Sequence, residues 1–150
     1  MARRGSINHH YDTYVVEGFA TIKKGLRVPK GKDLVVGQGA TILGSITAGQ
    51  SVFLSKNVIV RGSVKAATDA VLGAYVLVEG DVTADGDVLA LDGARILGRV
   101  VAGGRARIIG ARVDGRIEAK GDVEVRGEGS ALEIRAGGRV RSLPGPEAPA

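Results

Sequence analysis

Gly44-Ser45-Ile46-Thr47-Ala48 is the first of five copies of one motif, Gly-x-aliphatic-x-Ala, that decide how this chain folds. The other copies are Gly62-Ser63-Val64-Lys65-Ala66, Gly80-Asp81-Val82-Thr83-Ala84, Gly98-Arg99-Val100-Val101-Ala102 and Gly115-Arg116-Ile117-Glu118-Ala119. Successive glycines lie 18, 18, 18 and 17 residues apart. Self-similarity at a fixed period is typical of solenoids and other repeat architectures, so each copy predicts one turn of a solenoid.

Around the motif, small or aliphatic residues occur as i, i+2 pairs, and nearly every pair follows the previous one by six residues. The pairs run from Tyr14/Val16 and Ala20/Ile22 to Ile117/Ala119 and Val123/Val125, with a weaker continuation at Leu132/Ile134 and Val140. Residues two apart in a strand point to the same face, so each pair marks a short strand with two inward side chains. A helix would require apolar spacings of three and four residues, which do not recur.

Three strands in each 18-residue turn predict an all-β, triangular parallel β-helix of about six to seven turns. We expect a flexible N-terminal tail over residues 1–13, the β-helix over 14–141 and a Pro-containing C-terminal tail over 142–150. Glycines between the pairs predict corners, some with positive φ. An eight-residue step across residues 28–32 predicts a bulged corner, and a five-residue step near Gly110 predicts a tightened one.

The composition fits a narrow solenoid. Of 150 residues, 44% are hydrophobic but only 3% are aromatic, and 24 are glycine. A core made almost wholly of Val, Ile, Leu and Ala has few large side chains, so it has to be thin and regular. Because the chain has no cysteine, no secretory signal and no apolar run near the roughly 18 residues of a membrane span, we expect a cytoplasmic protein.

An enzyme has to be considered, because hexapeptide-repeat acyltransferases and the related carbonic anhydrases share the six-residue period. Both depend on histidine, and this chain has only His9 and His10, in the predicted tail. The acidic residues are scattered singly, so no general base with an orienting partner is evident. The segment Lys30-Gly31-Lys32-Asp33 lacks the earlier glycine and the Ser/Thr of a phosphate loop. We therefore expect no catalysis, no metal and no cofactor.

Positive charge is concentrated in the first half of the chain. Residues 1–75 carry ten Lys/Arg against four Asp/Glu, whereas residues 76–150 carry eleven against twelve. The cluster is either solvated surface or a contact for an anionic membrane, and nucleic acid is not favoured. The candidate residues for an anionic surface are Arg3, Arg4, Lys23, Lys24 and Arg27.

Outward residues at the 18-residue period should stack into columns, and one column is apolar: Val35, Phe53, Val71 and Leu89. A second, partly apolar column holds Thr41, Ile59 and Leu77. Contiguous apolar surface often marks a contact, so the first column is a candidate for lateral association. A terminal tail that folds over the column, or ordinary β-favourable surface, explains it equally well.

The two ends of a parallel coil present unpaired strand edges, which are templates for another chain unless they are capped. No helical or aromatic cap is evident in the sequence at either end. The ends therefore predict end-to-end stacking. The expected contact residues are Tyr14, Val16, Ile22, Leu132, Ile134 and Val140.

The run of Gly-x-[Ile/Val]-x-Ala motifs, in a cysteine-free chain with a short polar N-terminal tail and a Pro-containing C-terminal tail, resembles the bactofilins over residues 14–141. The resemblance implies a right-handed β-helix that self-assembles without nucleotide into filaments, a homopolymer that scaffolds cell-shape or envelope-associated proteins at the inner face of the membrane. Residues 1–11 lack the apolar anchor of many bactofilins, so lipid contact would rest on the basic residues. The alternatives are a non-polymerising β-solenoid binding module that uses its apolar or basic face, and a degenerate sugar or acyl transferase.

Overall fold

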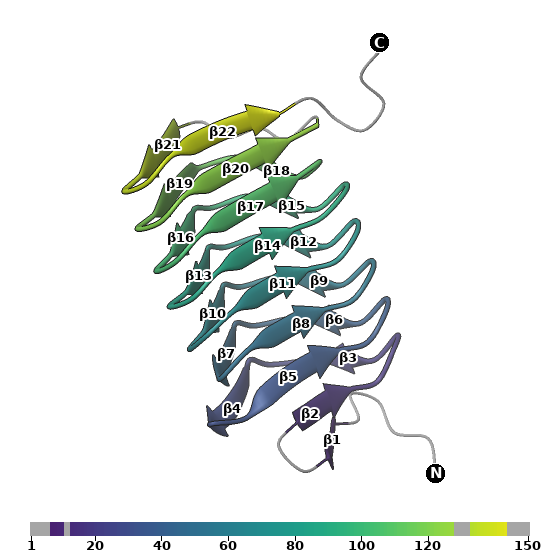
Figure 1. Cartoon of the computed structure of the whole chain (residues 1–150). Helices are drawn as coiled ribbons and strands as arrows, with labels where there is room; N and C mark the ends of the chain where they lie inside the picture. Colours follow the sequence, from purple (N-terminus) through teal and green to yellow (C-terminus); the bar gives the residue numbers. More distant parts are fainter. Residues whose placement is uncertain (1–6, 11–12, 128–132, 144–150) are drawn as a thin grey trace.

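The computed structural model describes residues 7–10, 13–127 and 133–143, and these residues form strands and turns without any helix. Three sheets wind around a common core as a β-solenoid of about seven turns (Figure 1), which confirms the predicted fold class. Neighbouring turns pair in parallel at a spacing of 18 residues through most of the chain, as between Val64 and Val82. The right-handed winding stays a prediction.

One strand of each turn belongs to a nine-stranded sheet, which carries one additional strand, β1, at its N-terminal edge. Its strands in spatial order are β1 (Ile7–His10), β2 (Thr13–Val16), β5 (Asp33–Val36), β8 (Val52–Leu54), β11 (Ala70–Leu72), β14 (Val88–Ala90), β17 (Ala106–Ile109), β20 (Val123–Arg126) and β22 (Val140–Leu143).

The second and third strands of each turn form the other two sheets. The six-stranded sheet holds β3 (Thr21–Ile22), β6 (Thr41–Ile42), β9 (Ile59–Val60), β12 (Leu77–Val78), β15 (Arg95–Ile96) and β18 (Arg112–Val113). The seven-stranded sheet holds β4 (Leu26–Lys30), β7 (Ile46–Gly49), β10 (Val64–Ala66), β13 (Val82–Ala84), β16 (Val100–Ala102), β19 (Arg116–Ala119) and β21 (Glu133–Ala136).

The core consists of the i, i+2 pairs that the sequence predicts. Every pair member from Leu26 to Val125 is buried, and all buried hydrophobic residues in the described part of the chain belong to these pairs. Pairs of neighbouring turns lie in register, as Ile46 and Ala48 do with Val64 and Ala66. Alternation of inward and outward side chains within each short strand therefore produces one continuous aliphatic core.

Both predicted irregularities are present. The register between β4 and β7 shifts between Val28 and Lys30, which is the bulged corner. Near Gly110 the spacing shortens, so that Arg95 pairs with Arg112 at 17 residues. The insertion and the deletion both fall at corners, where they leave the inward pairs in place.

The motif glycine is required for space rather than for positive φ. Ser45 Oγ accepts a hydrogen bond of 3.0 Å from the backbone N–H of Ser63, one turn later. A Cβ on Gly62 would lie 2.3 Å from that Oγ, so only glycine leaves room for the bond. The same arrangement continues upward: Ser63 Oγ accepts from the N–H of Asp81 at 3.0 Å, and Asp81 Oδ1 accepts from the N–H of Arg99 at 2.8 Å. Positive φ, expected at some of the corner glycines, occurs at Gly31, Gly39, Gly93, Gly110 and Gly127.

The two terminal boundaries differ from the expectation. Within the predicted flexible tail, β1 forms a strand antiparallel to β2, with Ile7 opposite Val16 and His10 opposite Thr13. At the other end β22 continues to Leu143, into the predicted C-terminal tail. The described residues contain no helix long and apolar enough to cross a membrane.

Candidate interaction surfaces

The two ends of the solenoid differ in how well the core is covered. At the N-terminal end Val16 is fully buried, Ile22 is 6% exposed and Tyr14 is partly buried, although all three lie in the first turn. At the C-terminal end Val140, which continues the inward row of Val123, is 53% exposed. The open end of the core is therefore the C-terminal one.

Two further residues were predicted as contacts at the C-terminal end, Leu132 and Ile134. Ile134 is partly buried and packs against the core cluster, in register with Ile117 of the preceding turn. Leu132 lies outside the described residues. Of the five predicted end contacts that the structure describes, Val140 is the one at an exposed core position.

The strand edges at the N-terminal end are not equivalent. In the described sheets β3 and β4 are the outermost strands of their sheets, whereas β2 is covered by β1. The expectation of an uncapped N-terminal end is therefore wrong for the nine-stranded sheet. At the C-terminal end β21 and β22 are the last described strands of their sheets, and each presents a strand edge of the kind that pairs with another chain.

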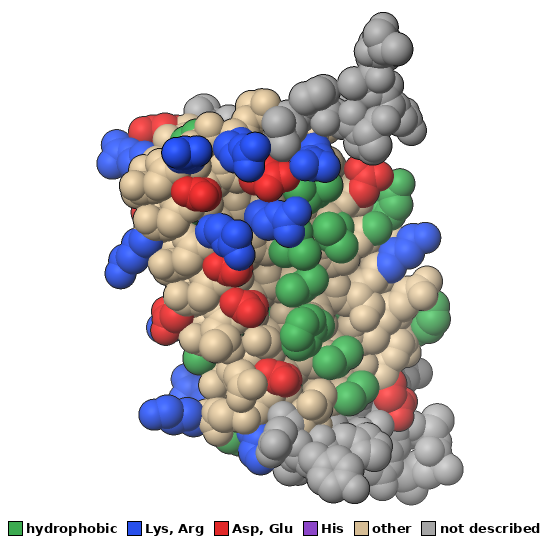
Figure 2. Space-filling model, in the orientation of Figure 1, with side chains coloured by type: hydrophobic (Ala, Val, Ile, Leu, Met, Phe, Trp, Pro, Cys, Tyr) green, Lys and Arg blue, Asp and Glu red, His purple; other side chains and the backbone are tan. Residues whose placement is uncertain are grey.

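The apolar column on the nine-stranded sheet is continuous, and it is one residue longer than the sequence predicted. Val35, Phe53, Val71 and Leu89 are consecutive register partners, and Val15 pairs with Val35 below them. Phe53 is 39% exposed and the other four are partly buried. Figure 2 shows hydrophobic side chains running along this face, with Lys and Arg side chains above them. We call these five residues the apolar column.

Val15 escaped prediction because it lies 20 residues before Val35, beyond the 18-residue period. The longer step at the bulged corner could have predicted this pairing, because the two additional residues there shift the register of the whole first turn. The column ends where Leu89 pairs with Arg107, and Arg107 forms an ion pair of 3.6 Å with Glu124 in the next turn. Any apolar contact on this face is thus limited to the first five turns.

The second column lies on the six-stranded sheet and is shorter. Thr41, Ile59 and Leu77 are register partners and partly buried, and Leu77 is followed by the exposed Arg95. Arg95 donates a hydrogen bond of 3.0 Å to Asp114. This face is therefore more polar than the face that carries Phe53.

Two aromatic residues at corners were missed by sequence reasoning. Phe19 is 77% exposed with φ 60°, and Tyr75 is 58% exposed with φ 59°. Positive φ is uncommon and strained for a bulky residue. Each ring lies over a glycine of the following turn, Gly39 or Gly93, where an added Cβ would come within about 2.5 Å of the ring. Each aromatic residue precedes its glycine by one turn, a relation that is recognisable only once the adjacent turns are known.

The predicted basic residues of the first turn form one exposed group. Lys23 and Lys24 follow β3 at a corner, Arg27 is an outward residue of β4, and all three side chains are exposed. Arg3 and Arg4 lie outside the described residues. The described basic residues thus lie at the N-terminal end of the solenoid, whereas the exposed core residue Val140 lies at the C-terminal end.

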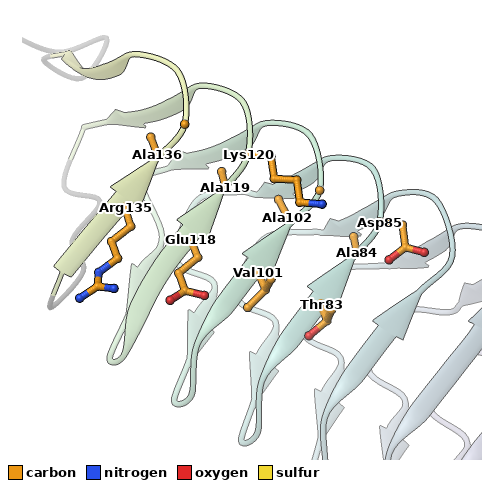
Figure 3. A pocket seen from close by; sticks show the side chains of 12 residues that line it. Thr83, Ala84, Asp85, Val101, Ala102, Glu118, Ala119, Lys120, Arg135 and Ala136 are labelled. Carbon is orange, nitrogen blue, oxygen red and sulfur yellow. The ribbon is translucent and has the colours of Figure 1, made fainter.

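A shallow groove of about 620 Å³ crosses the outer face of the seven-stranded sheet near its C-terminal end (Figure 3). Its lining combines outward strand residues, the inward alanines that end the strands and corner residues: Thr83, Ala84, Asp85, Val101, Ala102, Gly103, Glu118, Ala119, Lys120, Arg135, Ala136 and Gly137. In Figure 3 the side chains of Glu118 and Arg135 lie along one row with Val101 and Thr83. Among the described lining residues there is no Ser, Cys or His, and Thr83 has the one side-chain hydroxyl.

Four charged residues at or beside the groove form a network of ion pairs. Arg116 contacts Glu118 Oε1 and Glu133 Oε2, both at 3.1 Å, and Arg135 contacts Glu133 Oε1 at 3.0 Å. The hydrogen bond to Glu118 and the charge of Glu133 raise the pKa of Arg116. The hydrogen bond from Arg135, with the charges of Arg116 and Arg135, lowers the pKa of Glu133. Glu133 is thereby held as a carboxylate, which suits an ion pair and not a general acid.

Potential metal ligands do not converge among the residues that the structure describes: no group of three His, Cys, Asp or Glu side chains could hold an ion there. His9 and His10 belong to β1. The surfaces with distinctive physical features are thus the open C-terminal end, the apolar column and the basic N-terminal turn. No protein-family model, curated protein or solved structure matches this chain.

Proposed function

We propose that this protein is a structural, cytoskeletal protein whose activity is self-assembly into filaments by end-to-end stacking of solenoids, without nucleotide. The observation that carries the proposal is the open C-terminal end, where Val140 occupies an inward core position but is 53% exposed. Full burial of a valine side chain stabilises by about 1.5 kcal/mol or more. Because Val140 is 53% exposed, a second molecule that covers this end would recover roughly half of that energy.

The backbone supports the same contact. The edges of β21 and β22 have the N–H and C=O groups that pair with a following turn elsewhere in the solenoid, as β19 pairs with β21. A stacked molecule would continue both ladders and the aliphatic core at once. Because each molecule has two ends, contacts that do not close on themselves lengthen into filaments.

The cellular role is proposed by resemblance to the bactofilins. On that basis the filaments scaffold cell-shape or envelope-associated proteins, and the protein is cytoplasmic, at the inner face of the membrane. Lys23, Lys24 and Arg27 support the membrane contact, since each well-placed cation adds about 1 kcal/mol of attraction to an anionic surface. We propose no catalytic role, because Glu118 and Glu133 beside the groove are paired with Arg116.

Negative-stain electron microscopy of the purified protein in nucleotide-free buffer tests the proposal. We expect filaments whose number increases with protein concentration. Analytical ultracentrifugation over the same concentrations provides the quantitative readout, because filaments deplete the slowly sedimenting species. A sample that remains monomeric at every concentration would refute self-assembly.

The second candidate is a non-polymerising binding module that uses the apolar column, and the observation that favours it is the exposed Phe53. Phe53 lies in the centre of five apolar register partners, so a partner could bury a continuous row. This role predicts a monomer or dimer in ultracentrifugation, with binding lost in Phe53→Arg. Self-assembly predicts instead that Phe53→Arg still forms single filaments.

A further inference from the structure

We propose that β1 is a removable cap, which closes the N-terminal end of the solenoid and must leave β2 before a second molecule can stack there. The inference rests on the proposed self-assembly and adds a control step to it. The occupant of the uncovered end is a second copy of this chain.

The pairing of β1 distinguishes it from every turn of the solenoid. Each of its residues opposes one residue of β2: Ile7 with Val16, Asn8 with Val15, His9 with Tyr14 and His10 with Thr13. The pairing is antiparallel, whereas all other strand pairs in the described sheets are parallel. Figure 1 shows β1 beside β2 at the end of the stack that includes the N-terminus. β1 thus doubles back over the first turn and does not form a turn of its own.

The position of β1 makes the N-terminal end uneven. β1 extends the nine-stranded sheet by one strand, about 4.8 Å, while β3 and β4 remain the outermost described strands of the other two sheets. A second solenoid therefore cannot contact all three edges together while β1 is paired. Once β1 leaves, the edges of β2, β3 and β4 belong to the same turn and present a level surface.

The two ends also differ in how deeply their core residues are buried. Val16, opposite Ile7 in the β1–β2 pairing, is fully buried, whereas Val140 in the last turn is 53% exposed. The C-terminal end is ready for contact, and the N-terminal end is closed. Molecules with β1 in place can associate only through their C-terminal ends, so assembly stops at monomers or pairs. A four-residue edge strand held by one neighbour is marginally stable, which allows the cap to open.

A disulfide between β1 and β2 tests the inference in the full chain. The protein has no cysteine, so Asn8→Cys with Val15→Cys introduces a single possible intramolecular bridge at two directly opposed positions. Opposed residues of an antiparallel pair have Cβ atoms about 4.5–5.5 Å apart, close to the separation that a disulfide spans. We expect the oxidised protein to remain in the supernatant after high-speed centrifugation, and the same sample to form filaments after reduction. Val15→Cys alone is the control.

The converse variant opens the cap. Alternate residues of an antiparallel strand donate to the same neighbour, so Asn8→Pro with His9→Pro removes one N–H that faces β2. We expect the critical concentration for filaments to fall about tenfold or more, because the marginal pairing of β1 no longer has to be broken. Asn8→Ala with His9→Ala is the matched control and should retain the wild-type value. Circular dichroism checks that each variant keeps its β-solenoid.

The outcomes separate the cap from self-assembly itself. Equal polymerisation of the oxidised and reduced protein would overturn the cap and leave self-assembly standing. A critical concentration that rises in the proline variant would also overturn it, because β1 would then belong to the filament contact. Absence of filaments in every form would overturn both proposals.

Discussion

Substitution of Phe53 by arginine should prevent lateral association of filaments without preventing their formation. Phe53 is 39% exposed in the centre of the apolar column, between Val35 and Val71. A phenylalanine side chain offers about 200 Å², so roughly 80 Å² is available for contact. At about 25 cal/mol per Å² this area contributes roughly 2 kcal/mol for each molecule in a bundle.

A contact of this size is too small to hold two separate molecules together, since a stable interface buries about 800 Å² on each partner. Along a filament the same contact repeats with every molecule, so lateral association becomes strong only after assembly. Phe53→Arg removes the contact and adds a charge that would be desolvated in a bundle. We therefore expect bundles to disappear completely while single filaments remain.

Two centrifugation speeds provide the assay, because bundles sediment at low speed and single filaments only at high speed. Phe53→Arg should move the protein from the low-speed to the high-speed pellet. Thr47→Arg is the matched control, since Thr47 is an outward, partly buried residue of β7 on a different sheet. An unchanged low-speed pellet for Phe53→Arg would refute the reasoning, and so would an equal loss for the control.

Three further predictions concern the repeat, the last turn and the basic cluster. Gly62→Ala places a Cβ 2.3 Å from Ser45 Oγ; it should lower the free energy of unfolding by about 2 kcal/mol and Tm by roughly 4–8 °C. Adding Ser45→Ala should restore part of the loss in a thermal melt. The lowered pKa of Glu133 means that its ion pairs stabilise the last turn above pH 4.5 and are lost as pH falls through that lowered pKa. The difference in Tm between wild type and Glu133→Gln should therefore vanish in acid, and a constant difference would contradict this. Lys23→Glu with Lys24→Glu should reduce flotation with anionic vesicles but not with neutral ones, and equal flotation with both would count against an electrostatic contact.

The regular part of the fold was predictable because its signal is local and repeated. A strand with two inward residues shows a period of two, so pairs such as Val64/Ala66 and Val82/Ala84 identify the core without any tertiary information. The bulge after Val28 was visible as an irregular step in the same pattern. The 18-residue period also predicts the columns of outward side chains, and the predicted neighbourhood of Phe53 and Val71 is confirmed.

The features that escaped prediction depend on contacts between turns or on a single strand. The role of Gly62 follows from Ser45 one turn below, and such side-chain to backbone bonds have no local signature. β1 is one short strand without alternating apolar residues, so the sequence Ile7–His10 resembled a polar tail. Its pairing with β2 closes an end that the sequence left open. Stacking of Phe19 over Gly39 likewise requires knowledge of which turns are adjacent.

The most direct test of end-to-end assembly is high-speed sedimentation of Val140→Asp. Val140 is the exposed core residue of the last turn, so a carboxylate there would have to be desolvated in the stacked contact, at a cost of several kcal/mol. Because the position is 53% exposed in the single molecule, the β-rich circular dichroism should not change. Val101→Asp, an outward substitution on β16, is the control. The account predicts that Val140→Asp stays in the supernatant while wild type and control sediment, and sedimentation of Val140→Asp with a normal critical concentration would contradict it.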